Sequence, residues 1–301
     1  MKALVIGASG QLAQCLLEAP VRSTSAAAWS VTAAGRPELD ITSLEAVRAA
    51  IAAGQPDIVV NAAAYTAVDK AETEADAAFR INADGAGFAA TAAHECGLPI
   101  IHISTDYVYD GAKQSPYVET DPTSPVSVYG SSKLAGERAV ATANPRHVIL
   151  RTAWVHSPFG ANFVKTMLRL AAMRPEISVV DDQRGNPTYA PHLAEAILAI
   201  AGSIVGRGDG ERRFGIYHAA GRGDVTWCGL ARQVMDCAAR HGLPAVPIRP
   251  ITTADYPTPA RRPANSRLDT HRLEQSFGIA LPSWQDGVDQ CVARLAGAPS
   301  P

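Results

Sequence analysis

A tyrosine–lysine pair and an upstream threonine have the residue types needed for proton transfer. YGSSK at 129–133 sets Tyr129 four residues before Lys133, and STD at 104–106 closes an apolar run. A phenol has a pKa near 10, and a nearby ammonium lowers it. On a helix, residues four apart share one face. We predict that Tyr129 donates a proton to a substrate carbonyl, that Lys133 lowers its pKa and that Thr105 positions the carbonyl oxygen. Such a spacing also arises by chance.

A glycine-rich turn near the N-terminus predicts what acts with this tyrosine. GASGQLA at 7–13 follows an apolar run and opens a helical pattern. Gly7 permits a tight turn, Gly10 lets the backbone approach a pyrophosphate, and Ala13 is small enough for close helix–strand packing. The following helix offers free N–H groups to phosphates. The turn therefore predicts a nicotinamide dinucleotide as hydride carrier, the alternative being a simple tight turn.

The end of the second predicted strand bears on the choice of dinucleotide. An acidic residue there binds a free ribose 2′-hydroxyl, whereas an arginine accommodates a 2′-phosphate. This chain has Arg36, which favours NADPH and leaves NADH possible, unless Arg36 is only a surface residue. Asp40 follows and either contacts the adenine side or precedes a helix capped by Thr42 or Ser43.

Apolar runs and helical patterns alternate through the first half of the chain. The runs at 3–7, 29–35, 57–64, 98–104 and 147–152 predict buried strands, and 44–54 and 74–97 predict helices between them. This order predicts an α/β fold with a Rossmann-type doubly wound parallel sheet.

The regular alternation breaks after about residue 153, and prolines cluster from 244 to 263. We expect a smaller C-terminal substrate-binding lobe interleaved with the first domain. The predicted dinucleotide-binding domain covers 1–153 plus roughly 189–220, and the lobe covers roughly 154–188 plus 221–301.

Composition narrows the classes of function. The 301 residues carry a net charge of −2, without the basic surface that nucleic-acid binding needs. Five scattered cysteines form no CxxC pair, which is typical of a reducing compartment. The first apolar run is short for a signal peptide, and the tract at 196–206 is too short to cross a membrane. We expect a cytoplasmic protein with no nucleic-acid or membrane partner.

Six stretches together resemble one family. GASGQLA, NAAAYTAVDKAE, STDYVYDG, YGSSKLAGE, DDQRGNPT and ARRPANSRLDT are similar to TDP-4-dehydrorhamnose reductases, in the extended branch of the short-chain dehydrogenase/reductase superfamily. The resemblance implies reduction of the 4-keto group of TDP-4-dehydro-L-rhamnose by NADPH or NADH. The product would be TDP-L-rhamnose, a precursor of cell-surface polysaccharide.

The resemblance also implies roles for particular residues. Tyr129 would be the proton donor, Lys133 the cofactor-bound lysine and Thr105 its hydroxyl partner. The other cofactor contacts would come from Gly7, Ser9, Gly10, Gln11, Leu12, Arg36, Asp40, Ile41, Ala63, Ala64 and Tyr65. The sugar nucleotide would lie against Val68, Thr105, Asp106, Tyr107 and Trp154, although core packing explains Val68 and Trp154 equally well.

The chain departs from the family pattern at several positions. Tyr65 stands where the family usually has histidine, and Ala13 replaces a third glycine. Some members form dimers around magnesium held by glutamates, but here Gln14, Cys15 and Pro191 lie near those positions. We therefore expect no magnesium site, and a homodimer loses its main support.

Two late motifs add candidate substrate contacts. In DDQRGNPT, Gln183 and Arg184 either face the substrate or serve a turn. In ARRPANSRLDT, Arg262 and Asn265 are predicted to reach the substrate diphosphate, the alternative being a solvated loop before a helix near Thr270.

Two further functions stay open on this sequence. One is an epimerase or reductase for another nucleotide-linked keto-deoxysugar. The other is a non-catalytic dinucleotide-binding regulatory subunit. Consumption of NADPH in the presence of the keto-sugar nucleotide separates these possibilities.

Overall fold

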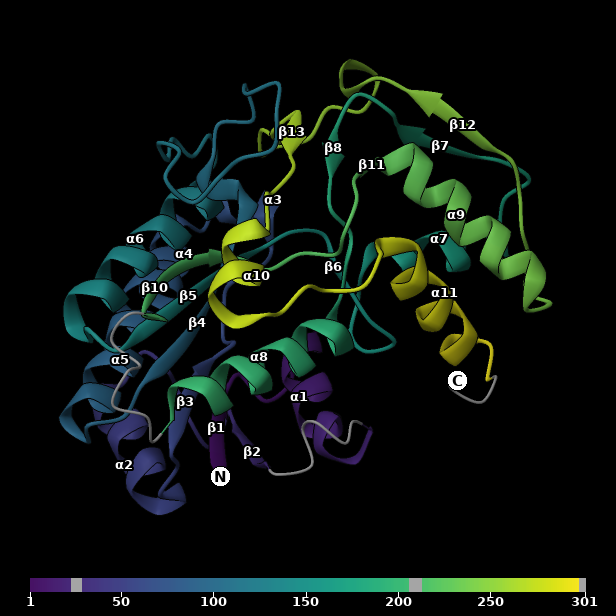
Figure 1. Cartoon of the computed structure of the whole chain (residues 1–301). Coiled ribbons are helices and arrows are strands. Elements are labelled where there is room, and N and C mark those ends of the chain that lie inside the picture. Colours follow the sequence, from purple (N-terminus) through teal and green to yellow (C-terminus); the bar gives the residue numbers. More distant parts are fainter. Residues whose placement is uncertain (23–28, 206–212, 298–301) are drawn as a thin grey trace.

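The computed structural model describes residues 1–22, 29–205 and 213–297. Within these ranges, the central sheet has six parallel strands in the order β10-β5-β4-β3-β1-β2. Their bounds are Lys2–Ile6 (β1), Ser30–Ala34 (β2), Ile58–Asn61 (β3), Ile100–Thr105 (β4), His147–Thr152 (β5) and Gly215–His218 (β10). The predicted Rossmann-type doubly wound parallel sheet is confirmed, with helices on both faces (Figure 1).

Two groups of helices cover the sheet, and β1 shows why both are needed. Ala3 and Val5 face the group formed by α1 and α8, whereas Leu4 and Ile6 face the group formed by α2, α5 and α6. Because successive side chains of a strand point to opposite faces, a strand covered on both sides is apolar throughout. The helices are α1 (Gln11–Arg22), α8 (Ala190–Ile204), α2 (Leu44–Gly54), α5 (Ala86–Glu95) and α6 (Val128–Ala143).

The helix predicted over 74–97 is present but contains a widened turn. It is divided into α4 (Ala75–Phe79), the π-helical η1 (Arg80–Gly85) and α5. The widened turn packs closely on α6, because a Cβ atom on Gly136 would lie 2.0 Å from the carbonyl oxygen of Asn82. A π-helical turn of this kind frequently marks a functional region.

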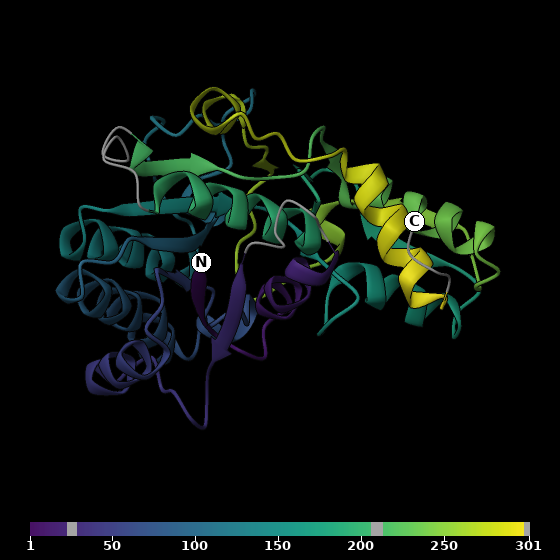
Figure 2. The same ribbon diagram turned by 60° about the horizontal axis from the view of Figure 1, so that its bottom comes forward.

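A second body surrounds its own apolar cluster. It contains α7 (Phe163–Ala171), α9 (Trp227–Arg240) and α11 (Trp284–Leu295), with β7 (Ile177–Val180) paired to β12 (Ile248–Ile251). Figure 2 shows this group beside the main sheet rather than over either face. The short pairings are β6 (Val155–His156) with β9 (Thr188–Tyr189), and β8 (Arg184–Gly185) with β11 (Val225–Thr226) and β13 (Asn265–Ser266).

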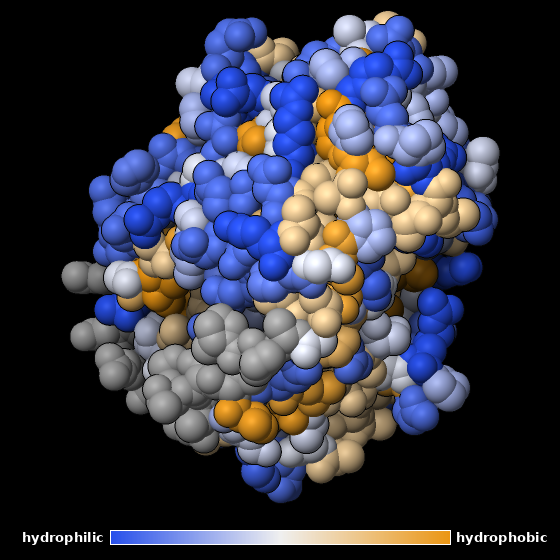
Figure 3. All heavy atoms as spheres, turned by 90° about the vertical axis from the view of Figure 1, so that its right-hand side faces the viewer, coloured by the Kyte–Doolittle hydropathy of each residue, from blue (hydrophilic) through white to orange (hydrophobic). Residues whose placement is uncertain are grey.

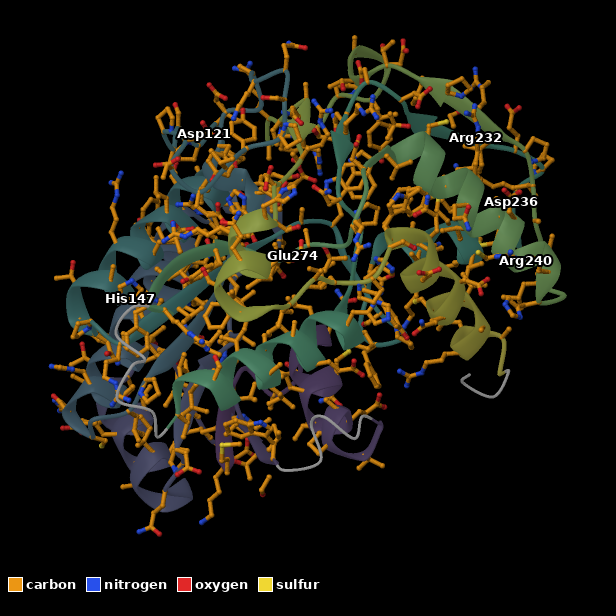
Figure 4. All side chains as sticks on the ribbon, in the orientation of Figure 1. Asp121, His147, Arg232, Asp236, Arg240 and Glu274 are labelled. Carbon is orange, nitrogen blue, oxygen red and sulfur yellow. The ribbon has the colours of Figure 1, made fainter. Side chains whose placement is uncertain are left out.

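The helix α9 has one exposed, charged side and one buried, apolar side. Arg232, Asp236 and Arg240 recur every four residues, are exposed and lie along the outer side of the helix (Figure 4). Val234 and Cys237 lie in the apolar cluster instead. Figure 3 views the molecule from this side and shows hydrophilic areas with an apolar band between them.

The two bodies are interleaved along the chain. The strand β10 lies at the edge of the central sheet, and between β5 and β10 the chain passes through the second body. The helix α10 (His271–Phe277) contacts β10, and Leu273 and Leu281 belong to the apolar cluster of the central sheet. This part of 221–301 therefore packs with the first body, because its leucines complete the cover of the edge strand.

Across the described ranges we find no helix with the length and apolar character needed to span a bilayer.

Candidate active site

A cleft of about 1090 Å³ lies at the carboxyl ends of the sheet strands, where ligands bind in open α/β sheets. Trp227 and Gly160 of the second body also line it. Most predicted site residues meet here: Gly7, Ser9, Gly10, Gln11, Leu12, Arg36, Asp40, Ile41, Ala63, Ala64, Tyr65, Val68, Thr105, Asp106, Tyr107, Tyr129, Lys133 and Trp154.

The glycine-rich turn forms one end of the cleft. Gly7 has φ +113°, and a Cβ atom there would lie 2.8 Å from the backbone nitrogen of Ala63. Only glycine fits this conformation and this contact. Near Gly10 the closest atom to a built Cβ is the carbonyl oxygen of Gly7 at 3.5 Å, so the backbone is open to a ligand. No acidic residue lies in the first turn of α1, which suits an anion at its N-terminus.

Gln11 connects this turn to the second body. Its Oε1 accepts hydrogen bonds of 2.9 Å from the Ser157 hydroxyl and from Nδ2 of Asn162. A Cβ atom on Gly160, which has φ +59°, would lie 3.1 Å from Cγ of Gln11. The side chain that begins α1 therefore also orients the loop at 157–162.

The catalytic candidates come from β4 and the first turns of α6. Ser127 caps α6 by accepting a 3.1 Å hydrogen bond from the Gly130 backbone. A Cβ atom on Gly130 would lie 2.2 Å from the carbonyl oxygen of Tyr107, so only glycine lets α6 approach so closely. This approach brings the Tyr129 phenol near enough to Thr105 for that hydroxyl to act on the Tyr129 pKa. The predicted α6 helix carrying Tyr129 and Lys133, and the predicted position of Thr105 at a strand end, are confirmed.

The predicted lowering of the Tyr129 pKa by Lys133 is wrong. Burial raises the pKa of Tyr129 to about 12, the Thr105 hydrogen bond opposes that rise, and the negative charge of Asp106 adds to it. Lys133 is buried, donates a 2.6 Å hydrogen bond to the carbonyl of Ile103, and has a pKa lowered to about 8 by burial. Desolvation is thus the largest cause of the Tyr129 pKa shift, and Lys133 is not among its causes. The phenol keeps its proton at neutral pH, as a proton donor must.

Asp106 is hydrogen-bonded to Thr105 and also lines the cleft. Its Oδ1 accepts a 3.0 Å hydrogen bond from the Thr105 hydroxyl, and its buried Oδ2 has no partner within the described part of the chain. Burial raises the pKa of Asp106 to about 6. The ring of Tyr107 meets the ring of Tyr129 edge to face at 5.5 Å. This ring contact with Tyr107 holds the Tyr129 phenol beside Thr105.

Asp40 lies in the segment that follows β2, and this segment forms one end of the cleft. The Asp40 carboxylate accepts hydrogen bonds from the backbone nitrogen and hydroxyl of Thr42, at 2.9 and 2.8 Å. The Thr42 backbone contact contributes most to lowering the Asp40 pKa. Ser43, not Thr42, caps α2. Asp40 thus has a defined orientation toward the cleft.

An aromatic stack forms the part of the cleft wall to which the second body contributes. Trp154 has φ +49° and stacks on Trp227, with ring centroids 3.5 Å apart and planes 9° apart. Phe163 packs against Trp227 at 4.7 Å. A Cβ atom on Gly185 would lie 2.5 Å from the Trp154 ring. Glycine at 185 and a left-handed backbone at 154 are both needed to place this indole.

Several residues of the two late motifs have partners within the protein. Arg262 pairs with Asp69 at 2.8 Å, and buried Asn265 donates to the carbonyls of Lys113 and Ser115 at 2.7 and 2.9 Å. Neither is among the residues lining the cleft. Arg262 therefore joins the second body to α3 (Val68–Ala71), and Asn265 orders the loop before α6. Their predicted contact with substrate stays a prediction.

The residues of DDQRGNPT also bond internally. Buried Gln183 donates to the hydroxyl of Thr253 at 2.9 Å, in η4 (Thr253–Asp255). Arg184 pairs with Asp224 at 2.6 Å. The interpretation of this motif as a structural turn thus accounts for the contacts of Gln183 and Arg184.

Comparison with known proteins shows the family of the whole chain. The family model described as the RmlD substrate binding domain matches residues 1–296. The chain belongs to this family. The resemblance that the sequence motifs indicated is confirmed.

Relatives of this RmlD family member cover nearly its whole length. It is 46% identical over 295 residues to dTDP-4-dehydrorhamnose reductase of Sinorhizobium fredii, covering 98% of each chain. A crystal structure of a dTDP-4-dehydrorhamnose reductase from Clostridium acetobutylicum is 36% identical with a TM-score of 0.89, covering 98% of this chain and 99% of that one. The Bacillus anthracis enzyme in complex with NADP is 32% identical with a TM-score of 0.87, covering 97% and 99%.

Sequence reasoning missed two notable cleft residues of this RmlD family member. Trp227 was not singled out, and Arg80 was counted only as part of a helix. Trp227 begins α9 directly after β11, far from Trp154 in the chain, and no local pattern links the two. At the position where the family usually has histidine, the Tyr65 hydroxyl donates a 2.5 Å hydrogen bond to Glu74.

Proposed function

We propose that this chain reduces the 4-keto group of TDP-4-dehydro-L-rhamnose to TDP-L-rhamnose, with NADPH as reductant and NADH as a possible substitute. The observation that carries the proposal is the meeting of Tyr129, Thr105 and Lys133 in the same cleft as an open glycine-rich turn. The names of the relatives support the same reaction.

The residues at the glycine-rich turn fit a dinucleotide. Gly10, Gln11 and Leu12 would hold the pyrophosphate at the N-terminus of α1, where no acidic side chain opposes it. The segment Ala63–Tyr65 would lie along the cofactor, and Lys133 would bond to the nicotinamide ribose. When bound, the nicotinamide supplies a hydride to the sugar C4.

The protein's own part of the reaction is to hold the keto group and to supply a proton. Tyr129 donates its phenolic proton to the 4-oxygen as this oxygen gains negative charge. Thr105 bonds to the same oxygen and orients the phenol. Because the raised pKa keeps Tyr129 protonated, the donor is in the correct state at neutral pH before the reduction.

The substrate side of the cleft suits a sugar nucleotide. Trp154 and Trp227 offer an apolar aromatic wall, and Val68, Asp106 and Tyr107 line the same cleft as Tyr129. Arg262 is close enough for its charge to act on Tyr107. We propose that it stabilises the substrate diphosphate while it remains paired with Asp69.

We also propose a cytoplasmic location. All five cysteines of the chain are free thiols, as expected of a protein in a reducing compartment. An NADPH-dependent step on a nucleotide sugar fits the same compartment.

The test is consumption of NADPH by the purified protein with a panel of TDP-4-keto sugars. Loss of NADPH absorbance with the 4-dehydro-L-rhamnose compound is expected. Tyr129→Phe should lower kcat by roughly 10²- to 10⁴-fold, because only the proton donor is removed, and should leave NADPH binding unchanged. Tyr256→Phe, at an exposed tyrosine outside the cleft lining, is the matched control.

Other outcomes point to the alternatives. Tightly held NAD with no net oxidation of added NADPH would indicate an epimerase. Binding of NADPH with no turnover of any keto-sugar would indicate a regulatory subunit. Turnover only with another TDP-keto-deoxysugar would indicate a sister reductase.

A further inference from the structure

One loop separates two of the residues that build the aromatic wall of the cleft. Residues 157–162 join β6, which follows Trp154, to α7, which begins at Phe163. The rings of Trp154 and Phe163 both contact Trp227, at centroid distances of 3.5 and 4.7 Å. Gly160 of the loop lines the cleft beside them. The place of this loop therefore sets where both of its aromatic neighbours lie.

The side chain of Asn162 shapes the loop and begins α7. Its Oδ1 accepts a 3.1 Å hydrogen bond from the backbone nitrogen of Lys165 and so caps the helix. Its Nδ2 donates to the carbonyls of Ser157 and Phe159 at 2.7 and 3.3 Å. Because the amide oxygen serves the helix, the amide nitrogen faces the rest of the loop, and any further partner of this nitrogen must be a hydrogen-bond acceptor.

Gln11, the first residue of α1, supplies such an acceptor. Its Oε1 lies 2.9 Å from Nδ2 of Asn162 and 2.9 Å from the buried hydroxyl of Ser157. Gly160 comes so close that a Cβ atom on it would lie 3.1 Å from Cγ of Gln11. The bonds within the loop fix its shape, whereas the bonds to Gln11 fix its place against the glycine-rich turn of the first body.

The aromatic wall depends on such support because Trp154 is strained. Its backbone is left-handed, with φ +49°, and a bulky residue keeps that conformation only where the surrounding packing holds it. The stack on Trp227 supplies part of this packing, and Phe163 packs against Trp227 in turn. If the loop shifts, the indole of Trp154 can leave the wall with a gain in backbone energy. A ligand that contacts the indole then has to restore its place, which lowers affinity.

We propose that Gln11 is a positioning residue for the sugar-nucleotide side of the cleft, acting through Asn162 on the aromatic wall. The inference deepens the proposed function and rests on it for the identity of the ligand at that wall. Loss of the Gln11 carboxamide then weakens binding of the nucleotide sugar and spares the dinucleotide. This is the reverse of what the position of Gln11 in the glycine-rich turn suggests.

The test follows two binding equilibria in which no reaction takes place. TDP-L-rhamnose, which is already reduced, is titrated by calorimetry into the protein saturated with NADPH, and NADPH is titrated into the protein alone. Gln11→Ala should weaken binding of TDP-L-rhamnose by roughly tenfold, near the upper value for one neutral hydrogen bond. Binding of NADPH should change by less than about threefold, because the backbone N–H groups at the start of α1 are retained.

Asn162→Ser removes the same contact from the other side. Serine caps helices as well as asparagine does, so α7 should keep its start, but serine lacks the amide nitrogen that donates to Gln11. The loss of affinity for TDP-L-rhamnose should match that of Gln11→Ala within about threefold, and the double variant should lose little more, because both changes delete one shared contact. Asn162 is not among the residues lining the cleft, so NADPH binding should not change.

Gln14→Ala is the matched control. Gln14 has the same side chain on the same helix, and its Nε2 donates a 2.6 Å hydrogen bond to the carbonyl of Ala8 in the glycine-rich turn. This variant disturbs the turn without touching the loop, and it should bind TDP-L-rhamnose within about twofold of wild type. Near-ultraviolet circular dichroism, which reports fixed packing of aromatic side chains, should change in Gln11→Ala and Asn162→Ser but not in Gln14→Ala.

The outcomes separate this inference from the proposed function. Unchanged binding of TDP-L-rhamnose in Gln11→Ala or in Asn162→Ser would overturn the inference, and so would an equal loss in Gln14→Ala. A wild-type protein that binds no TDP-L-rhamnose would overturn the proposed function. The near-ultraviolet spectra would then decide the inference alone: a change confined to Gln11→Ala and Asn162→Ser supports it, and any other pattern overturns it.

Discussion

Replacing Glu137 with glutamine should destabilise this fold far more than the same change at Glu95. Glu137 on α6 and Arg151 on β5 form a bidentate pair, with Nε–Oε1 and Nη2–Oε2 distances of 2.9 and 2.7 Å. Arg48 and Glu95 form a pair of the same chemistry, with distances of 2.8 and 2.6 Å. The side chains of the first pair are each 3% exposed, and those of the second are 46% and 43% exposed.

The size of the expected effect follows from burial. Arg151 also donates to the Tyr109 hydroxyl at 2.7 Å, and Ser104 donates to Glu137 at 2.5 Å. Removing one partner of a buried ion pair leaves an uncompensated charge and costs about 3–5 kcal/mol. At about 2 °C per kcal/mol in a chain of this size, the unfolding midpoint of Glu137→Gln should fall by about 6–10 °C.

The assay is thermal and urea unfolding followed by circular dichroism. Glu95→Gln should leave the midpoint within the error of the measurement, because water solvates the freed arginine. The double variant Glu137→Met with Arg151→Met should recover much of the loss, since no buried charge is left unpaired. Equal midpoints for Glu137→Gln and Glu95→Gln would refute the reasoning from burial.

Two further predictions concern the cleft. Because burial lowers the pKa of Lys133 from 10.5 to about 8, its folded form releases a proton first. The free energy of unfolding should therefore rise between pH 8 and 10.5, where the unfolded chain binds more protons than the folded one. Over the same range kcat/KM for NADPH should fall above pH 8. A flat kcat/KM profile to pH 10 would contradict this prediction. Gly185→Ala places a Cβ atom 2.5 Å from the Trp154 ring and should cost about 1–3 kcal/mol of stability. It should also raise KM for the sugar nucleotide but not for NADPH, and an unchanged sugar-nucleotide KM would show that the indole does not contact substrate.

Much of the fold follows from local patterns. The glycine-rich turn at 7–10, the strand ending at Thr105 and the helix carrying Tyr129 and Lys133 were all predictable. Each depends on residues close together in the chain, where periodicity and the special conformations of glycine act directly.

Other features depend on contacts between distant segments. The widened turn over 80–85 and the Trp154–Trp227 stack have no local signature, since each forms only where segments pack together. The same holds for α10, which covers the edge strand β10 rather than the second body.

By itself, the sequence determined the class of sheet, the place of the glycine-rich turn and the choice of Tyr129 as the proposed proton donor, because these follow from residue type and spacing. Tertiary structure decided the protonation state of Tyr129. It also brought Arg36 and Arg80, which are far apart in the chain, to the same cleft. The reason is physical: a pKa depends on how much water and charge surround the group, and the packing of distant segments sets both.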